Sequence, residues 1–246
     1  MTVQHSYDKR NEFADLYLRI RDREGRIYSD QELLQLPNVP DTHPLSKEWK
    51  IRRRSSDCLL QYIARRNSPL RILEVGCGNG WLSARMAKLA SATVIGSDIN
   101  FQELQQAATV FSDYPNLHFL YGDIRSGILN DGQFDIILFA ASIQYFPDLE
   151  GLIIDCLALL SKDGEIHVLD SPFYDASEIR LARQRTIDYY QAIGMPEMSQ
   201  QYFHHSIDSI HSFKWKYQYK PSGFPFGWMR RNPFPWIIIE KKEVQQ

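Results

Sequence analysis

The chain has 246 residues, of which 43% are apolar and 24% charged, so its length fits one domain with extensions and its composition excludes a largely disordered protein. The 28 Lys and Arg residues against 30 Asp and Glu residues give a net charge of −2, which argues against nucleic-acid binding through a broad cationic face. The three cysteines are widely spaced and form no CxxC pair, so a disulfide framework is not expected. The polar start predicts no secretory signal, and no apolar run reaches the roughly 18 residues of a membrane span. Together these features predict a cytoplasmic protein.

Residues 1–69 are polar and helical in outline, with a proline-rich loop around LPNVPDTHPL. A helix is predicted to begin at Ser46 and to continue through Ile63. Its basic run, Lys50 and Arg52 to Arg54, could bind an anion, but a solvated helix face paired with carboxylates is the favoured interpretation.

Between Leu70 and Asp170, short β-branched runs alternate with helical stretches. The predicted strands are 71–75, 93–98, 117–121, 134–139 and 165–170, and the predicted helices lie near 81–90, 101–111 and 148–160. Asn100 is expected to cap the second of these helices, and Asp163-Gly164 to form the turn into the fifth strand. The strands are continuously apolar, as parallel strands covered on both faces are, so the pattern predicts a doubly wound α/β sheet.

The first of these strands runs into a glycine-rich loop, ILEVGCGNGWLS, in which Gly76, Gly78 and Gly80 allow a tight turn and a close approach of ligand to backbone. Trp81 stands where the dinucleotide fingerprint requires glycine, and no Lys-Ser/Thr pair follows as in a P-loop. A nicotinamide-dependent oxidoreductase is therefore disfavoured.

Two acidic residues follow the next strands at the same edge. Asp98 ends the second strand, where a carboxylate can accept both hydroxyls of a ribose, and Asp123 follows the third, where it could meet an exocyclic amine. Asp123 could equally cap a turn.

In this combination, EVGCGNG, GSDIN and GDI resemble the motifs of class I S-adenosylmethionine-dependent methyltransferases over about residues 70–170. The resemblance implies a Rossmann-like seven-stranded sheet in the order 3-2-1-4-5-7-6 with a helical N-terminal extension. It implies an extension or lid over 1–69 and a methyltransferase domain over 70–246, with a substrate-side insertion at about 171–212 and a C-terminal β-hairpin.

The same resemblance implies S-adenosylmethionine as the cofactor. The positions that match the family's cofactor-binding residues are Glu74, Gly76, Gly78, Gly80, Asp98, Ile99, Asp123, Ile124, Ala140 and Ser142. Glu74 could instead be a structural acid, and Trp81 could pack either over the ligand or in the core. Cys77 is expected to be an unreactive thiol. No residue is assigned to a metal.

No catalytic base can be named from the sequence, because Gln144 stands where many relatives carry a histidine near the transfer site. His43 in the proline-rich loop, Tyr145 after the fourth strand and Asp170 at the end of the fifth are the candidates. His167 is interpreted as a packed strand histidine. His204 and His205 are adjacent, so on extended backbone they point to opposite sides.

The C-terminal third predicts a helix near 176–193 and strands at 213–219 and 235–241, separated by an aromatic loop. Basic and aromatic residues alternate in FKWKYQY, which could indicate single-stranded nucleic acid. A strand with Phe213, Trp215, Tyr217 and Tyr219 on one buried side explains the same pattern and is preferred.

The sequence thus predicts a methyltransferase that acts on a small-molecule acceptor of unknown identity. A non-catalytic S-adenosylmethionine-binding protein of the same fold, or an RNA methyltransferase, would also fit the motifs.

Overall fold

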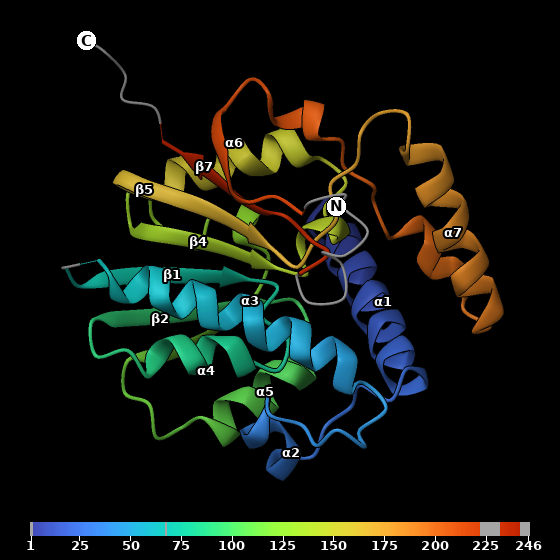
Figure 1. Ribbon diagram of the computed structural model, residues 1–246, viewed down its shortest axis with the longest axis horizontal. Coiled ribbons are helices and arrows are strands. Elements are labelled where there is room, and N and C mark those ends of the chain that lie inside the picture. Colours follow the sequence, from blue (N-terminus) through green and yellow to red (C-terminus); the bar gives the residue numbers. More distant parts are fainter. Residues whose placement is uncertain (1, 67, 222–231, 242–246) are drawn as a thin grey trace.

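The computed structural model describes residues 2–66, 68–221 and 232–241 (Figure 1). Its centre is a seven-stranded sheet in the order β3-β2-β1-β4-β5-β7-β6, which confirms the predicted topology. The strands are β1 (Leu70–Val75), β2 (Ala92–Asp98), β3 (Leu117–Tyr121), β4 (Phe134–Ala140), β5 (Leu160–Leu169), β6 (Lys214–Tyr219) and β7 (Trp236–Glu240). Neighbouring strands are parallel except β7, which runs antiparallel to both β5 and β6.

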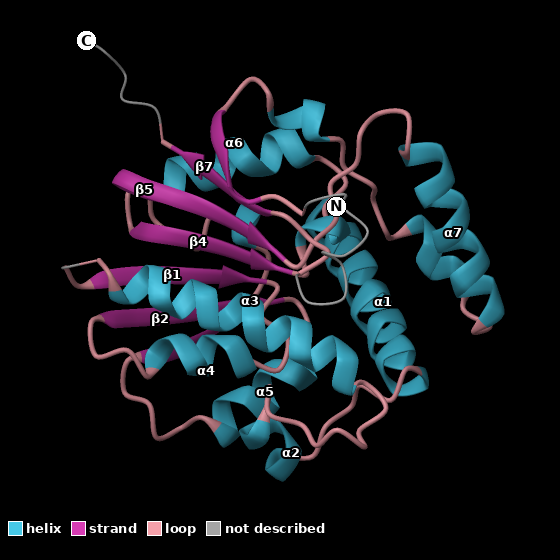
Figure 2. Cartoon of the chain, in the orientation of Figure 1, coloured by secondary structure: helices cyan, strands magenta, loops and turns pink. Residues whose placement is uncertain are grey.

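Helices cover both faces of the sheet (Figure 2). The α-helices are α1 (Thr2–Arg23), α2 (Asp30–Gln35), α3 (Ser46–Ala64), α4 (Trp81–Ala87), α5 (Phe101–Val110), α6 (Leu149–Leu159) and α7 (Ile179–Ala192). Residues of α3, α4 and α5 share one apolar cluster with the sheet, and α6 packs in a second cluster on the opposite face. This two-sided burial explains why the central strands are apolar throughout.

Local chemistry sets where the helices begin. The Asn100 side chain accepts hydrogen bonds from the backbone N–H groups of Gln102 and Glu103, so it caps α5 as predicted. Asp148 caps α6 through the N–H of Gly151. Gly80 precedes α4 with a φ of 72°, a left-handed conformation that favours glycine.

The predicted turn at Asp163-Gly164 is wrong, because both residues lie within β5. Phe134 of β4 pairs with Leu160 of β5, but the next pair is Ile136 with Glu165, so four residues of β5 oppose one of β4. Asp163 and Gly164 belong to this bulge. A Cβ atom on Gly164 would come within 2.9 Å of the Leu160 side chain, so the bulge requires glycine there.

The C-terminal hairpin forms as predicted, except at its tip. Trp215 and Tyr217 pack against the cluster that contains α6. The register shifts between Tyr217 and Tyr219, and Tyr219 packs against the other cluster. Strict alternation therefore fails at Tyr219, because a register irregularity changes the face that a side chain meets. Most of the predicted aromatic loop lies outside the described residues.

The carboxyl ends of the parallel strands face α1 and α7, which stand side by side beyond that edge of the sheet (Figure 1). Leu16 and Ile20 of α1 share a small apolar cluster with Tyr190 of α7 and with Met195 and Met198. In the described part of the chain, no helix is long and apolar enough to cross a membrane.

Candidate functional site

The glycine loop after β1 is built so that side chains would not fit. Gly76, Gly78 and Gly80 all have positive φ angles. A Cβ atom on Gly76 would lie 2.6 Å from Cβ of Ser142, and one on Gly80 would lie 2.7 Å from the Phe119 ring. The loop therefore holds bare backbone against its neighbours at the carboxyl edge.

Asp98 lies at the end of β2, against this loop. Its Oδ2 accepts a hydrogen bond of 2.7 Å from the N–H of Gly78, and its Oδ1 accepts one of 2.8 Å from the N–H of Asn100. Burial raises the pKa of Asp98, although these backbone hydrogen bonds oppose the shift. The carboxylate is thereby fixed beside the glycine loop, where a ribose is expected.

Three buried polar atoms around this loop find no hydrogen-bond partner among the described residues: Nε of Arg21, Nδ2 of Asn100 and Oε2 of Glu103. Nη2 of Arg21 lies 3.6 Å from Oε1 of Glu103, too long for a good hydrogen bond. Burial raises the pKa of Glu103 to about 7, although Arg21 opposes the shift. Buried polar atoms without partners are costly, so this cluster fits a polar ligand such as the expected cofactor.

Glu74 and Ser142 tie the loop to its surroundings. Glu74 is 3% exposed and accepts a hydrogen bond from the Ser83 hydroxyl. Burial raises the pKa of Glu74 to about 8. Ser142 donates a hydrogen bond of 2.6 Å to the carbonyl of Val75, which joins the loop after β4 to the end of β1.

The other expected cofactor residues lie near the same edge in different settings. Asp123 caps a short 3₁₀ helix by accepting from the N–H of Arg125, so the capping role is the one seen. Ile124 is buried in the cluster that contains α6, Ala140 ends β4, and Ile99 directly follows β2. Their contacts with a cofactor stay predictions.

Asp170 directly follows β5, where it is half-buried and has a strained backbone. It has a φ of 51°, and Ala141, at the end of the neighbouring β4, has a φ of 56°. The N–H of Ala141 donates to the carbonyl of Leu169, so the two left-handed residues are adjacent. Such conformations cost about 1–3 kcal/mol each and concentrate at functional sites.

Both carboxyl oxygens of Asp170 accept hydrogen bonds from distant segments. The Ser55 hydroxyl of α3 donates at 2.7 Å, and Nδ2 of Asn232 donates at 2.9 Å. Burial raises the pKa of Asp170, with the charge of Arg52 opposing the shift. Asp170 is therefore a well-held carboxyl group with increased basicity.

Tyr145 belongs to the aromatic contacts between α1 and the carboxyl edge. Its ring lies 5.8 Å from that of Phe13, 5.6 Å from that of Tyr17 and 5.9 Å from that of Tyr202. Burial raises its pKa. Tyr145 thus stays protonated near neutral pH and lies under α1.

The histidines take packing and hydrogen-bonding roles. Nδ1 of His43 accepts from the N–H of Leu45, and its ring lies against Tyr28, so these contacts tie it to the N-terminal extension. His167 is fully buried and bonds Glu165 and Trp236, which confirms the packed strand histidine. His204 and His205 have separate partners, Thr186 and the Ile143 carbonyl.

Comparison with known proteins decides the family of this fold. Residues 72–164 match a family profile described as a methyltransferase domain. A ubiquinone biosynthesis O-methyltransferase from Escherichia coli O157:H7 is 30% identical over 135 residues, which span 50% of this chain and 52% of that relative. Residues 72–164 are thus a methyltransferase domain, and the strand order is that of class I S-adenosylmethionine-dependent methyltransferases.

Solved structures agree with this methyltransferase domain in fold. A candidate sarcosine dimethylglycine methyltransferase from Galdieria sulphuraria is 10% identical, with a TM-score of 0.60 over 93% of this chain and 98% of its own. The CurJ carbon methyltransferase is 14% identical, with a TM-score of 0.59 over 88% of this chain and 62% of its own. The curated alignments, in contrast, span about half the length of those relatives.

The structure adds to the methyltransferase domain several residues that the sequence did not single out. Arg21 and Glu103 meet beside the glycine loop, and Ser55 and Asn232 hold Asp170. Glu103 could have been found from the sequence, because it lies three residues after the predicted cap Asn100 and therefore in the first turn of α5, at the carboxyl edge. Arg21, Ser55 and Asn232 had none, since their partners are distant in sequence.

Structural contacts account for three further features of the sequence: Trp81, Cys77 and the basic run of α3. Trp81 is a core residue, with its ring 5.2 Å from that of Trp49. Burial raises the pKa of Cys77, in keeping with an unreactive thiol. Lys50 pairs with Asp41 and Arg52 with Glu48, as expected for a solvated helix face.

Proposed function

We propose that the protein is an S-adenosylmethionine-dependent methyltransferase that methylates a hydroxyl oxygen of a small molecule. The observation that carries the proposal is the fixed Asp98 carboxylate beside a glycine loop surrounded by unpartnered buried polar atoms. The O-methyltransferase relatives support oxygen as the accepting atom. The near-zero net charge favours a small molecule over RNA.

We assign a separate set of side chains to each end of the cofactor. Asp98 would accept hydrogen bonds from the ribose hydroxyls. At the other end, Arg21 would bind the carboxylate of the methionine portion and Glu103 its ammonium group. This arrangement pairs each buried charge with an opposite one and supplies partners for Nε of Arg21 and Oε2 of Glu103.

The chemistry assigns a proton-accepting role to Asp170. When bound, S-adenosylmethionine supplies a methyl group on a sulfonium, which is a very good leaving group. The chain's own contribution is then to orient the acceptor and to exclude water. A neutral hydroxyl attacks more readily if a base takes its proton, and the raised pKa of Asp170 suits that base. The Ser55 and Asn232 hydrogen bonds hold its carboxyl group in place.

The test is calorimetric binding of S-adenosylhomocysteine to the wild-type chain, Asp98→Asn and Asp131→Asn. Asp131 is an exposed acid in a turn far along the sequence and serves as the charge-matched control. We expect wild type and Asp131→Asn to bind equally. Asp98→Asn should bind at least about tenfold more weakly, because a charge-assisted hydrogen bond contributes about 1.5–3 kcal/mol. Absence of binding, or equal binding by all three proteins, would refute the proposal.

A further inference from the structure

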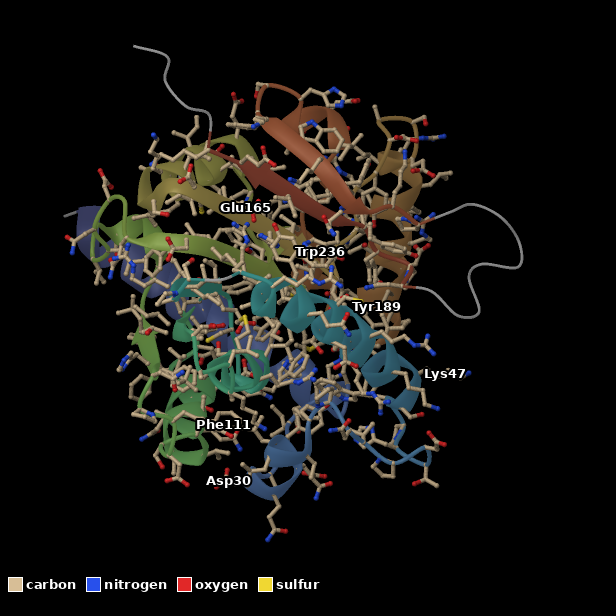
Figure 3. All side chains as sticks on the ribbon, turned by 60° about the vertical axis from the view of Figure 1, so that its left-hand side comes forward. Asp30, Lys47, Phe111, Glu165, Tyr189 and Trp236 are labelled. Carbon is tan, nitrogen blue, oxygen red and sulfur yellow. The ribbon has the colours of Figure 1, made fainter. Side chains whose placement is uncertain are left out.

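A cavity of about 510 Å³ lies between α3 and the β6–β7 hairpin. Trp236 is the first residue of β7, and its ring lies 5.4 Å from that of Tyr62 on α3 (Figure 3). We call this space the α3 cavity. Its volume is in the range of small-molecule sites in proteins.

The α3 cavity adjoins Asp170. Ser55 and Asn232 line it and also donate the two hydrogen bonds that hold the Asp170 carboxyl group. Leu169, the residue before Asp170, lines it as well. A molecule in this cavity therefore lies one side chain away from the proposed base.

The aromatic walls of the α3 cavity present rings, since their polar ends are already bonded within the protein. The Tyr62 hydroxyl donates to Glu165 at 2.6 Å, and Nε1 of Trp236 donates to His167 at 3.1 Å. The Tyr219 hydroxyl donates to the carbonyl of Asn232 at 2.9 Å. What remains for a ligand is ring surface, which suits an aromatic partner.

The charge of the α3 cavity is positive. Arg54 and Arg65 line it from one face of α3, three helical turns apart, and Cys58 and Gln61 lie on that face between them. None of the described lining residues carries a carboxyl group. Arg65 forms no ion pair with any described carboxylate, so its guanidinium is available for an anion.

We propose that the α3 cavity binds the methyl acceptor and that the acceptor is a planar aromatic compound with one acidic group. The rings of Tyr62 and Trp236 contact its aromatic body, and Arg65 binds its anionic substituent. Only the statement that the bound compound is the methyl acceptor rests on the proposed function. The binding of an aromatic anion in the cavity stands without it.

The experiment uses 8-anilinonaphthalene-1-sulfonate, an aromatic anion whose fluorescence reports binding, titrated into the full-length chain. Cys58→Trp fills the cavity from an exposed position, and Cys58→Ser is its control. Arg65→Gln removes the proposed anion partner. Arg53→Gln changes an exposed arginine of the same helix that is not among the lining residues.

We expect one site in the wild type, no binding by Cys58→Trp and about tenfold weaker binding by Arg65→Gln. Cys58→Ser and Arg53→Gln should bind like the wild type. Unchanged binding by Cys58→Trp, or equal weakening by both arginine variants, overturns the proposal.

Calorimetry with S-adenosylhomocysteine on the same proteins separates the two claims. Wild-type affinity in Cys58→Trp is the expected result. If neither the wild type nor any variant binds S-adenosylhomocysteine, although the dye binds as expected, both the proposed function and the acceptor assignment are refuted. The cavity then remains an aromatic-anion site.

Discussion

Arg21 and Glu103 form a buried pair of opposite charges that do not satisfy each other. The closest approach of their side chains is 3.6 Å, and each keeps one polar atom without a described partner. Burying charges costs several kcal/mol per ion unless the geometry and hydrogen bonding are good. A zwitterionic group between them would bind both, which is why we assign them to the methionine end of the cofactor.

This assignment predicts a ligand-dependent effect of Glu103→Gln. At pH 8, above the pKa of about 7 for Glu103, the carboxylate is charged, so the variant loses a charge-assisted hydrogen bond. We expect S-adenosylhomocysteine to bind about tenfold more weakly. Binding of 5′-methylthioadenosine, which lacks the amino-acid end, should be unchanged in the same calorimetric series.

Arg21→Met should show the same selectivity, and Glu150→Gln, at an exposed acid on α6, serves as the control. Equal weakening of both ligands would mean that Glu103 acts on the shape of the loop, since such an effect would not distinguish the two ends.

Among the elements, α1 is held mainly by distant parts of the chain. Leu16 and Ile20 pack against Tyr190, Met195 and Met198. Nη1 of Arg23 donates to the carbonyl of Ile193 at 2.6 Å. Because α1 also brings Tyr17 and Arg21 to the carboxyl edge, its docking controls whether that edge is covered.

Ile20→Ala should loosen this docking. Ile20 is 3% exposed, and truncation of a buried isoleucine costs about 2–5 kcal/mol. We expect hydrogen exchange of the amides in 13–23 to become at least about tenfold faster, with the strands of the sheet unchanged. Mass spectrometry measures this directly.

Asp22→Ala, at an exposed position of the same helix, should exchange like the wild type. S-adenosylhomocysteine should restore part of the protection in Ile20→Ala, because its proposed position lies between α1 and the glycine loop. Identical exchange in the two variants would show that the apolar cluster does not hold α1.

The elements also show what the sequence could predict. The doubly wound sheet and the candidate site at its carboxyl edge were predicted from βαβ alternation and from the residues after β1 and β2, because these signals are local. The strand order came from the family resemblance. The position of α1 was not predictable, since its partners lie about 170 residues away. The partners of Asp170 were missed for the same reason, as Ser55 is 115 residues and Asn232 62 residues distant.

Across the described chain, four buried or half-buried glutamates fall into two sets with opposite pKa shifts. Burial would raise the pKa values of Glu48 and Glu165. Hydrogen bonds from Arg26 to Glu48, and from His167 and Tyr62 to Glu165, lower both to about 2. Burial raises the pKa of Glu74 to about 8 and that of Glu103 to about 7. The second set lies beside the glycine loop.

The two sets act on stability in opposite pH ranges. Groups with lowered pKa values stabilise the folded chain above about pH 4.5, and this stabilisation is lost as the pH falls toward 2. Groups with raised values bind a proton in the folded state that the unfolded chain has released. Their contribution is therefore lost as the pH rises from about 4.5 to 8. The combined contribution of these four groups should therefore be greatest near pH 5.

Glu74→Gln isolates the alkaline side of this balance. The amide can still accept the hydrogen bond from Ser83 but has no proton to lose, so the fall in Tm between pH 5 and pH 8 should be smaller by at least about 3 °C. Scanning calorimetry at both values, with the exposed Glu197→Gln as control, measures the difference. If the fall in Tm between pH 5 and pH 8 is the same in Glu74→Gln, Glu197→Gln and the wild type, Glu74 is already ionised in the folded chain. The glycine loop would then carry a full negative charge beside Asp98.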